Sequence, residues 1–373
     1  MRGEANPAPS FLTVINLSQR IPADHPLRAI KPRVETVLKR LSPEFDALYA
    51  QGGRPSIPPE QLLKSKVLMA LYSVRSERLF CEQLGYNLLW LWFLDRELED
   101  GAWDHSTFSQ NQERVLSSDV AKLFFVEVYQ LSRAEGWTSD AHFTVDGTLV
   151  EAWASLKSFV RKDGQDARKV EKAKDDDPGN PTVDFRGEKR CNQTHQSTTD
   201  PQSVLYRKGN GRESRLCFGA HVLMENRNGL CAQITVHNPI AEKEPAVAVA
   251  QLDEHTTTFA GVAVSTVAAD KGYHEKGFVA DCRQRDIAPH VACKESVRIP
   301  GLDGRTTQAA GYQTSQRLRK RVEEIFGWMK TVGGLRRTRY RGIDRTQSWA
   351  YFVASAYNLL RMGRLAAQQI APT

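Results

Sequence analysis

The sequence predicts an α/β (α+β) protein in which a mixed sheet with flanking helices follows an all-helical N-terminal domain. Apolar residues recur at helical spacing up to about residue 137, and alternating apolar strands begin at residue 142. An antiparallel hairpin is then joined to alternating strands and helices, which is typical of a mixed sheet covered by helices. A chain of 373 residues is long enough for about two domains, and we expect them at 1–137 and 138–373.

The helical region is delimited by residues that favour helix starts and ends. The expected starts are Pro58–Pro59, Ser76, Ser106 and Asp119, and the last helix is expected to end at Gly136. Several short helices joined by tight turns are common in DNA-binding domains, but the same pattern is also found in ordinary helical bundles. The pattern alone favours the bundle.

The second region carries the strands. An Asn-Arg-Asn-Gly turn at 226–229 separates two alternating apolar runs, which is a strong hairpin signal. A highly polar and charged segment at about 157–213 is expected to be a flexible surface insertion. The expected strands are 142–147, 216–224, 230–236, 262–269 and 287–292, and the expected helices are 245–254, 276–285, 316–330 and 346–365.

Composition restricts the class of protein only loosely. The net charge of +7 makes a polyanionic partner plausible, although many basic proteins bind no nucleic acid. The 6 cysteines form no CxxC pair, so we expect reduced thiols and no zinc site. The most apolar stretch, 88–94, is too short to span a bilayer, and no apolar run follows the charged N-terminus. We therefore expect a soluble, cytoplasmic protein without a membrane partner.

Two aspartates stand at the ends of apolar strands. Asp146 ends the strand that begins at residue 142, and Asp270 ends the buried run before it. Carboxylates at strand ends project toward the rim of a sheet, where ligands usually bind. A single aspartate in such a place is more often a turn or cap residue. With two of them in one domain, a site and a structural role are about equally supported.

A glutamate on the helix expected at 316–330 adds a third carboxylate. Arg319, Glu323 and Lys330 are spaced by four and seven residues, so they share one face beside the apolar stripe. The simpler interpretation is a solvent-exposed charged face on which Arg319 and Glu323, one helical turn apart, form an ion pair. A carboxylate flanked by cations also suits a phosphate-bearing site, because the carboxylate can bind metal while the cations bind phosphate oxygens.

The motifs around these residues resemble those of the DDE transposases of bacterial insertion sequences. They are Asp-Gly-Thr at 146–148, Ala-Asp-Lys-Gly-Tyr at 269–273, and an Arg, a Glu and a Lys at 319, 323 and 330. One departure is Gln316, where related transposases often carry a tyrosine. Shorter motifs that fit the same family, including its helical N-terminal transposase domain, stand at 53–55, 76–78, 103–108, 151–155, 334–337 and 358–359. The ordered set covers nearly the whole chain.

The resemblance implies a ribonuclease H-like catalytic domain and a helical N-terminal DNA-binding domain. Asp146, Asp270 and Glu323 would then be the catalytic residues and would hold two Mg²⁺ ions, with Mn²⁺ as a possible substitute. Glu324 is the neighbouring alternative, but the spacing to Arg319 and Lys330 selects Glu323. The implied activity is cleavage at the terminal inverted repeats of the element, followed by joining of the 3′-hydroxyl to target DNA. A homodimer on DNA, in the bacterial nucleoid, is expected with it.

Basic residues are concentrated after the last candidate site residue. Between residues 317 and 345 there are ten Lys or Arg and three acidic residues. Such a run is usually a solvated face, but beside a phosphate site it favours a track for double-stranded DNA. The expected DNA-binding residues are Arg319, Lys330, Arg336, Arg337, Arg339 and Arg341. The alternatives are a metal-dependent DNA nuclease without strand transfer, and a catalytically silent DNA-binding protein derived from a transposase.

Overall fold

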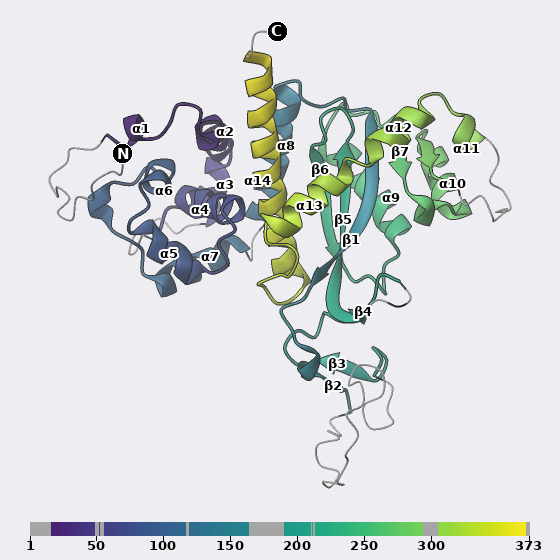
Figure 1. Ribbon diagram of the computed structural model, residues 1–373, viewed down its shortest axis with the longest axis horizontal. Helices are drawn as coiled ribbons and strands as arrows, with labels where there is room; N and C mark the ends of the chain where they lie inside the picture. Colours follow the sequence, from purple (N-terminus) through teal and green to yellow (C-terminus); the bar gives the residue numbers. More distant parts are fainter. Residues whose placement is uncertain are drawn as a thin grey trace, which may run out of the picture.

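The computed structural model describes residues 16–48, 52, 56–116, 119–163, 190–209, 211, 213–293 and 305–370. The 53–55 motif and the middle of the predicted insertion lie outside these ranges. A helical region and a sheet domain stand on either side of the long helix α14 (Ile343–Ile370), as Figure 1 shows. No helix in the described ranges is long and apolar enough to cross a membrane.

The helical region confirms most of the predicted helix starts. Ser76 caps α5, because its hydroxyl accepts a hydrogen bond from the N–H of Leu79 at 3.1 Å. The predicted cap Ser106 is wrong: Asp104 caps α7 instead, and its carboxylate accepts from the N–H groups of Ser106 and Thr107, both at 3.0 Å. The helices are α1 (Leu17–Arg20), α2 (Pro26–Arg40), α3 (Ser42–Leu48), α4 (Pro59–Leu71), α5 (Glu77–Leu84), α6 (Leu88–Phe93), α7 (His105–Leu116) and α8 (Val120–Ala134), with a 3-10 turn η1 (Leu98–Asp100).

The sheet domain contains a six-stranded mixed sheet. Five of its strands lie side by side in the order β6-β5-β1-β7-β8. The sixth, β4, also pairs with β5, on the same edge as β6. β1 is antiparallel to β5 but parallel to β7, and β7 is parallel to β8. The strands are β1 (His142–Glu151), β4 (Val204–Tyr206), β5 (Arg215–Glu225), β6 (Cys231–His237), β7 (Thr266–Ala269) and β8 (Ala288–Val291). This arrangement is the ribonuclease H-like sheet, with the predicted hairpin at β5–β6.

A buried carboxylate stabilises the hairpin turn. Glu225 is fully buried at the end of β5. Its side chain accepts hydrogen bonds from the backbone N–H groups of Arg227 at 2.7 Å and Asn228 at 2.9 Å. It also accepts from the N–H of Ser139 at 3.0 Å, so it ties the turn to the segment that leads into β1. Charge-assisted bonds of this kind satisfy several turn donors with one side chain.

Helices cover both faces of the sheet. The ring of His255 on α9 (Glu244–Thr258) lies 4.9 Å from that of Phe143, and Lys330 on α13 (Val322–Thr331) bonds to Thr148. Successive side chains of a strand point to opposite faces of the sheet, and positions 143 and 148 are an odd number of residues apart on β1. The helices α9 and α13 therefore lie on opposite faces. α10 (Lys276–Gln284) packs on α9 and β8, and α14 packs on β6 as well as on α8, α4 and α2. The short α11 (Arg305–Gln308) contacts β8.

The predicted helix at 316–330 is wrong in one respect, because it is two helices. α12 (Tyr312–Arg319) ends before a tight turn at Lys320 and Arg321, and α13 begins at Val322. The N–H of Glu323 bonds to the carbonyl of Lys320, three residues back, instead of continuing the α-helical pattern. α12 packs on β1, β7 and β8, whereas α13 packs on β1 and α14. The bend lets each half follow its own contact surface.

Both ends of the predicted insertion carry ordered structure. A 3-10 turn η2 (Leu156–Ser158) leads into β2 (Phe159–Arg161), which pairs antiparallel with β3 (His195–Ser197). The following turn caps α14: the carboxylate of Asp200 accepts from the N–H of Gly342 at 3.2 Å, and Gln202 accepts from that of Ile343 at 2.7 Å. Residues 164–189 of the predicted insertion are outside the described ranges.

Candidate active site

Asp146 and Asp270 are brought side by side by the parallel pairing of β1 and β7. Thr144 is the register partner of Ala268, and each aspartate follows its paired residue by two positions. Neighbouring strands are separated by about 4.8 Å, so the two carboxylates stand at the same level of the sheet, just past the end of the pairing between β1 and β7. The prediction that Asp146 ends its strand is wrong, because β1 continues to Glu151 through its pairing with β5, and only the pairing with β7 ends before Asp146. Asp270 directly follows the end of β7, as predicted. The strand order makes the two strands adjacent.

The environment of Asp146 disfavours its negative charge. Asp146 is half-buried, and burial raises the pKa of its carboxyl group. The N–H of Gly147 donates to its Oδ1 at 2.8 Å and lowers the pKa in part. The charge of Asp270 raises the pKa of Asp146, whereas Lys208 and Arg319 lower it. Two carboxylates held together in this way form a place where a bound cation would relieve repulsion.

A buried chain of hydrogen bonds supports the turn after Asp270. Asp270 caps the 3-10 turn η4 (Lys271–Tyr273), and its Oδ1 accepts from the N–H of Gly272 at 2.7 Å. The hydroxyl of Tyr273 bonds to Nε2 of His221, whose Nδ1 lies 2.7 Å from Oε1 of Gln251. An amide oxygen only accepts, so Nδ1 carries the proton and Nε2 accepts from the tyrosine. Tyr273 and His221 are both fully buried.

Gln316, the departure from the family pattern, has a clear structural role. Its Nε2 donates to the carbonyl of His290 and, at 3.4 Å, to the carbonyl of Ala269, so it attaches α12 to the carboxyl ends of β8 and β7. Its Oε1 accepts from Nε of Arg319 at 3.3 Å. Gln316 therefore orients the arginine whose charge acts on Asp146.

Glu323 lies on α13 and is exposed to solvent. At the other end of the same helix, Nζ of Lys330 donates to Oγ1 of Thr148, two residues beyond Asp146 on β1. The helix thus runs alongside β1, with Glu323 at the end nearer Arg319. Within the described ranges, however, no three His, Cys, Asp or Glu side chains are close enough together to hold a metal ion. The triad with Asp270 remains a prediction.

Five of the six predicted DNA-binding residues have positions compatible with a surface role. The charge of Arg319 acts on Asp146, and Lys330 bonds to Thr148, two residues beyond Asp146 on β1. Arg336 and Arg337 are exposed where their segment meets the end of β1: the carbonyl of Arg336 accepts from the N–H of Glu151, and Nε of Arg337 donates to the carbonyl of Ala152 at 3.3 Å. Arg341 is exposed at the turn before α14.

Arg339 is different because its guanidinium is packed in the interior. It lies 4.2 Å from the ring centroid of Trp349 and 5.8 Å from that of Tyr340. Nη1 is buried without a hydrogen-bond partner within the described ranges, and burial lowers the pKa of the group. The side chain therefore serves packing between the 334–342 segment and α14.

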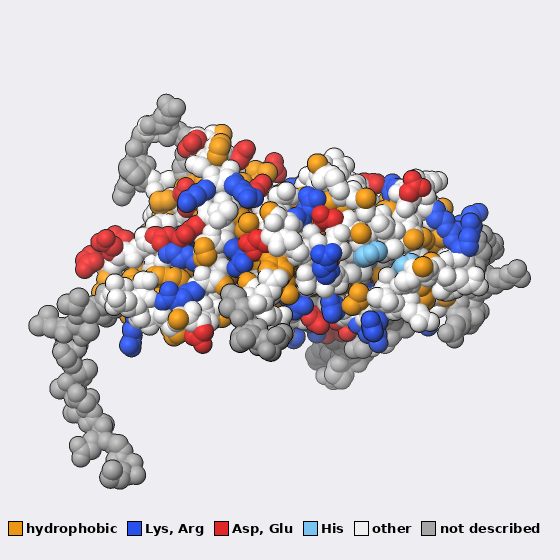
Figure 2. All heavy atoms as spheres, turned by 90° about the horizontal axis from the view of Figure 1, so that it is seen from above, with side chains coloured by type: hydrophobic (Ala, Val, Ile, Leu, Met, Phe, Trp, Pro, Cys, Tyr) orange, Lys and Arg blue, Asp and Glu red, His pale blue; other side chains and the backbone are white. Residues whose placement is uncertain are grey.

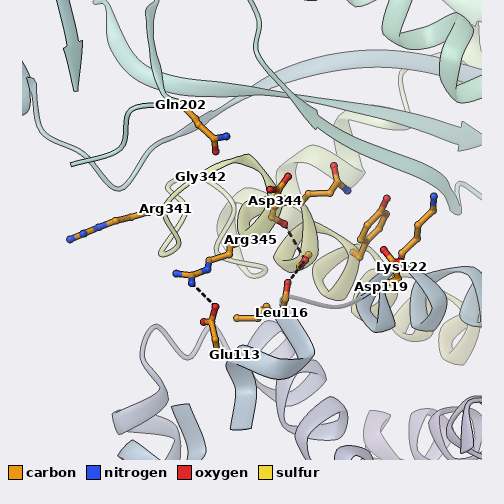
Figure 3. Close-up of a pocket in the computed structure, with 12 residues that line it drawn as sticks. Glu113, Leu116, Asp119, Lys122, Gln202, Arg341, Gly342, Asp344 and Arg345 are labelled. Atoms are coloured by element: carbon orange, nitrogen blue, oxygen red, sulfur yellow. Dashed lines mark hydrogen bonds and ion pairs between the residues drawn. The ribbon is translucent and has the colours of Figure 1, made fainter. Parts of the chain in front are cut away.

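A cavity of about 550 Å³ lies elsewhere, between α7, α8 and the start of α14. Arg345 forms an ion pair with Glu113 across it, and Arg341 points away from that pair (Figure 3). None of the three candidate catalytic residues lines this cavity. Figure 2 shows basic and acidic side chains interspersed on the face that it draws, so that face is not a single basic surface.

The sequence interpretation missed a fourth carboxylate. Glu244, the first residue of α9, lies against Gly147, and its charge interacts with those of Asp146 and Asp270. An acidic residue in the first turn of a helix is common for electrostatic reasons alone. The sequence therefore gave no signal that separated Glu244 from an ordinary helix start.

The donor set suits a divalent cation. Mg²⁺ prefers oxygen ligands, and Asp146 and Asp270 offer carboxylate oxygens at the same level of two adjacent strands. In the part of the chain that the structure describes, neither carboxylate forms an ion pair with Lys, Arg or His.

Two family models match the chain, and both describe transposases. The Transposase domain (DUF772) matches residues 15–114, and the Transposase DDE domain matches residues 184–359. The second match includes Asp270 and Glu323, and Asp146 precedes it. A search of curated proteins found no match.

Among solved structures, the chain is similar to a piggyBac transposase synaptic complex with hairpin DNA, at 11% identity and a TM-score of 0.42, covering 96% of this chain and 79% of that chain. It is also similar to a pre-cleavage Mos1 transpososome, at 9% identity and a TM-score of 0.22, covering 88% and 87%. A Mos1 mariner paired end complex with Mn follows at 11% identity and a TM-score of 0.21, covering 90% and 86%.

The two family models account for the helical region and for most of the sheet domain. The ordered motifs and the ribonuclease H-like strand order agree with them. Divalent metal ions are general in this family. The chain belongs to the DDE-type transposases of insertion sequences.

Proposed function

We propose that the protein binds the terminal inverted repeats of its insertion sequence, cleaves the DNA at the element's ends and joins the 3′-hydroxyl to target DNA. The observation that carries the proposal is the pair Asp146 and Asp270, held level on adjacent parallel strands beside Arg319. Glu323 on α13 is proposed as the third carboxylate. The family membership makes strand cleavage and joining the chemistry that such a site would perform.

The metal requirement follows from the carboxylates. Asp146, Asp270 and Glu323 would hold Mg²⁺, or Mn²⁺ in its place. Two such ions, when bound, would supply charge stabilisation for the attacking and leaving oxygens of an in-line phosphoryl transfer. Arg319 and Lys330 would hold phosphate oxygens next to the carboxylates, and Gln316 would keep Arg319 in place.

The exposed basic residues Arg336, Arg337 and Arg341 are proposed to follow the DNA backbone away from the site. Phosphate contacts of this kind position the duplex but carry no sequence information. The helical region is proposed to recognise the terminal repeats. A homodimer on DNA is part of the proposal, because the two ends of one element must be processed together.

The test is a cleavage and strand-transfer assay with a labelled duplex carrying the inverted repeats that flank the gene, a supercoiled target plasmid and Mg²⁺. Asp146→Asn and Asp270→Asn are expected to lower cleavage and joining by about a thousandfold, since metal clamping is worth several kcal/mol. Glu323→Gln is expected to do the same. Glu324→Gln is the matched control, because Glu324 is the exposed neighbour on the same helix.

The outcomes separate the proposal from its alternatives. Cleavage that survives Asp146→Asn in Mg²⁺ would rule out the proposed site. Ends that are cut but never joined, under conditions that allow target binding, would favour a nuclease. Sequence-specific binding of the repeats without any metal-dependent cutting would favour a silent DNA-binding protein. Loss of activity in Glu324→Gln but not in Glu323→Gln would move the third carboxylate by one residue.

A further inference from the structure

Glu244 is positioned at the candidate site by its helix and by a glycine. It is the first residue of α9, and its side chain lies over the β1 backbone next to Asp146. A Cβ added at Gly147 would come within 2.6 Å of Oε1 and 2.8 Å of Cδ of Glu244. Glycine inside a strand is unfavourable in general and often marks a close approach of another group. Here that group is a carboxylate.

The surroundings of Glu244 are those of the site. Glu244 as a whole is exposed, but its carboxylate is partly buried, and this burial raises its pKa. The charge of Asp146 raises the pKa further, Lys208 lowers it and Asp270 raises it. Burial raises the pKa of the Tyr273 hydroxyl, and the charges of the same three carboxylates raise it further.

No group on the described part of the chain neutralises these charges by direct pairing. Neither Asp146, Asp270 nor Glu244 takes part in an ion pair within the described ranges. Nor does the carboxylate of Glu244 cap its own helix, where Lys243 occupies the cap position without a side-chain bond. Carboxylates kept together without counter-ions repel one another, and the repulsion is relieved when a cation binds between them.

We infer that Glu244 is an additional metal-binding carboxylate of the Asp146–Asp270 site, reaching the ion from the α9 side of β1 while Glu323 approaches from α13. The inference rests on the proposed function, because it assigns Glu244 to the same divalent cation. The described side chains are not at ligand spacing, so binding would draw Glu244 and the aspartates together by side-chain rotation. Gly147 leaves the space in which the glutamate carboxylate moves.

The experiment measures Mn²⁺ binding to the full chain without DNA, by electron paramagnetic resonance of the free ion during titration. Glu244→Gln is expected to weaken Mn²⁺ binding about tenfold or more. Glu242→Gln, at an exposed residue in the same segment, is expected to bind Mn²⁺ as the unchanged protein does. Gly147→Ala keeps every carboxylate but obstructs Glu244, and it is expected to weaken binding in the same direction.

Thermal unfolding separates metal binding from a purely structural role. Without metal, Glu244→Gln removes repulsion from Asp146 and Asp270, so its Tm is expected to equal or exceed that of the unchanged protein. The rise in Tm that Mn²⁺ produces is expected to shrink. A lower metal-free Tm with an unchanged Mn²⁺-induced rise would overturn the inference and make Glu244 a structural residue. Should Glu244→Gln fail to fold, Gly147→Ala and Glu244→Asp provide the same comparison.

Asp146→Asn distinguishes failure of the inference from failure of the proposed function. If Asp146→Asn loses Mn²⁺ binding while Glu244→Gln retains it, the inference is wrong and the proposed site stands. If Asp146→Asn binds Mn²⁺ normally, the proposed metal site itself is wrong. Loss of binding in both variants, with Glu242→Gln unaffected, supports both.

Discussion

Glu77, in one of the short motifs that the family shares, stabilises the interior of the helical region. Lys66 on α4 is fully buried, and its Nζ lies 2.9 Å from Oε1 of Glu77 and 2.9 Å from the hydroxyl of Tyr340. Ser109 donates to the other carboxylate oxygen at 2.6 Å. The motif residue Ser76 caps the helix that carries Glu77. This motif therefore holds α4, α5 and α7 together with the 334–342 segment.

Glu77→Gln is expected to destabilise the protein by about 3 kcal/mol at pH 7, because it leaves the buried ammonium of Lys66 without a counter-charge. Burial raises the pKa of Glu77, but Lys66 and Ser109 outweigh it and leave the pKa below its usual value. A lowered carboxyl pKa contributes stability that is present above pH 4.5 and is lost as the pH falls through the folded-state value. Urea unfolding at pH 7 and in this acid range measures both effects.

Glu82→Gln is the matched control for Glu77, since Glu82 is exposed on the same helix. Its free energy of unfolding is expected to stay within about 0.5 kcal/mol of that of the unchanged protein. If Glu77→Gln were as stable as this control and kept the same acid dependence, the pair with Lys66 would not stabilise the fold.

At the scale of elements, the site depends on the short turn η4 that follows β7. Tyr273 is expected to fix this turn through the buried bond to His221. Tyr273→Phe leaves Nε2 of His221 buried without a donor, which costs about 1–3 kcal/mol. It also loosens the turn that carries Asp270. We expect DNA cleavage to fall about tenfold while the Kd for the duplex is unchanged, because no phosphate contact is lost.

The comparison for Tyr273→Phe is Tyr86→Phe, at a tyrosine that is 66% exposed in the helical region. Both the stability and the cleavage rate of this control are expected to be unchanged. A Tyr273→Phe variant that loses stability but keeps the full cleavage rate would show that the bond supports the fold without positioning Asp270.

Local patterns in the sequence predicted the elements better than their junctions. The Asn-Gly turn and the alternating runs gave β5 and β6 correctly, because hairpins are determined by neighbouring residues. The break between α12 and α13 was missed, since the apolar stripe continues across Lys320 and only packing on two different surfaces bends the chain there. Helix spacing therefore could not place Glu323 relative to Asp146.

The same distinction holds for the residues of the site. Asp146 and Asp270 were both predicted from strand ends, but Asp146 lies inside β1, because pairing with β5 carries this strand on to Glu151. The parallel pairing of β1 with β7 makes the two aspartates neighbours. Glu244 could not be found in this way, because its approach to Gly147 depends on how α9 lies over β1. Arg339 was grouped with exposed arginines by composition, although the rings of Tyr340 and Trp349 enclose it. Burial of a charged side chain is a tertiary property.

At the scale of the whole molecule, α14 joins the helical region to the sheet. It packs on α8, α4 and α2 on one side and on β6 on the other. Asn358, fully buried on this helix, accepts from the N–H of Cys231 and donates to its carbonyl, both at 2.8 Å. The half-buried Arg339 and Tyr340 lie in the segment that leads into the helix. The exposed basic residues of the 336–341 segment are thus attached to a rigid junction between the two parts.

This arrangement separates the arginines that would bind DNA from the one that stabilises the junction. Replacing Arg336, Arg337 and Arg341 together by Ala is expected to weaken binding to any 30-base-pair duplex and to reduce the slope of log Kd against log salt by about 2.7, since each phosphate contact contributes about 0.9. Arg339→Ala is expected to lower the free energy of unfolding and leave this slope unchanged, because its guanidinium is enclosed between rings. Lys276→Ala, at the exposed first residue of the distant helix α10, should alter neither quantity. An unchanged slope in the triple variant would place the DNA track elsewhere on the molecule, and a reduced slope in Arg339→Ala would mean that the junction opens to admit DNA.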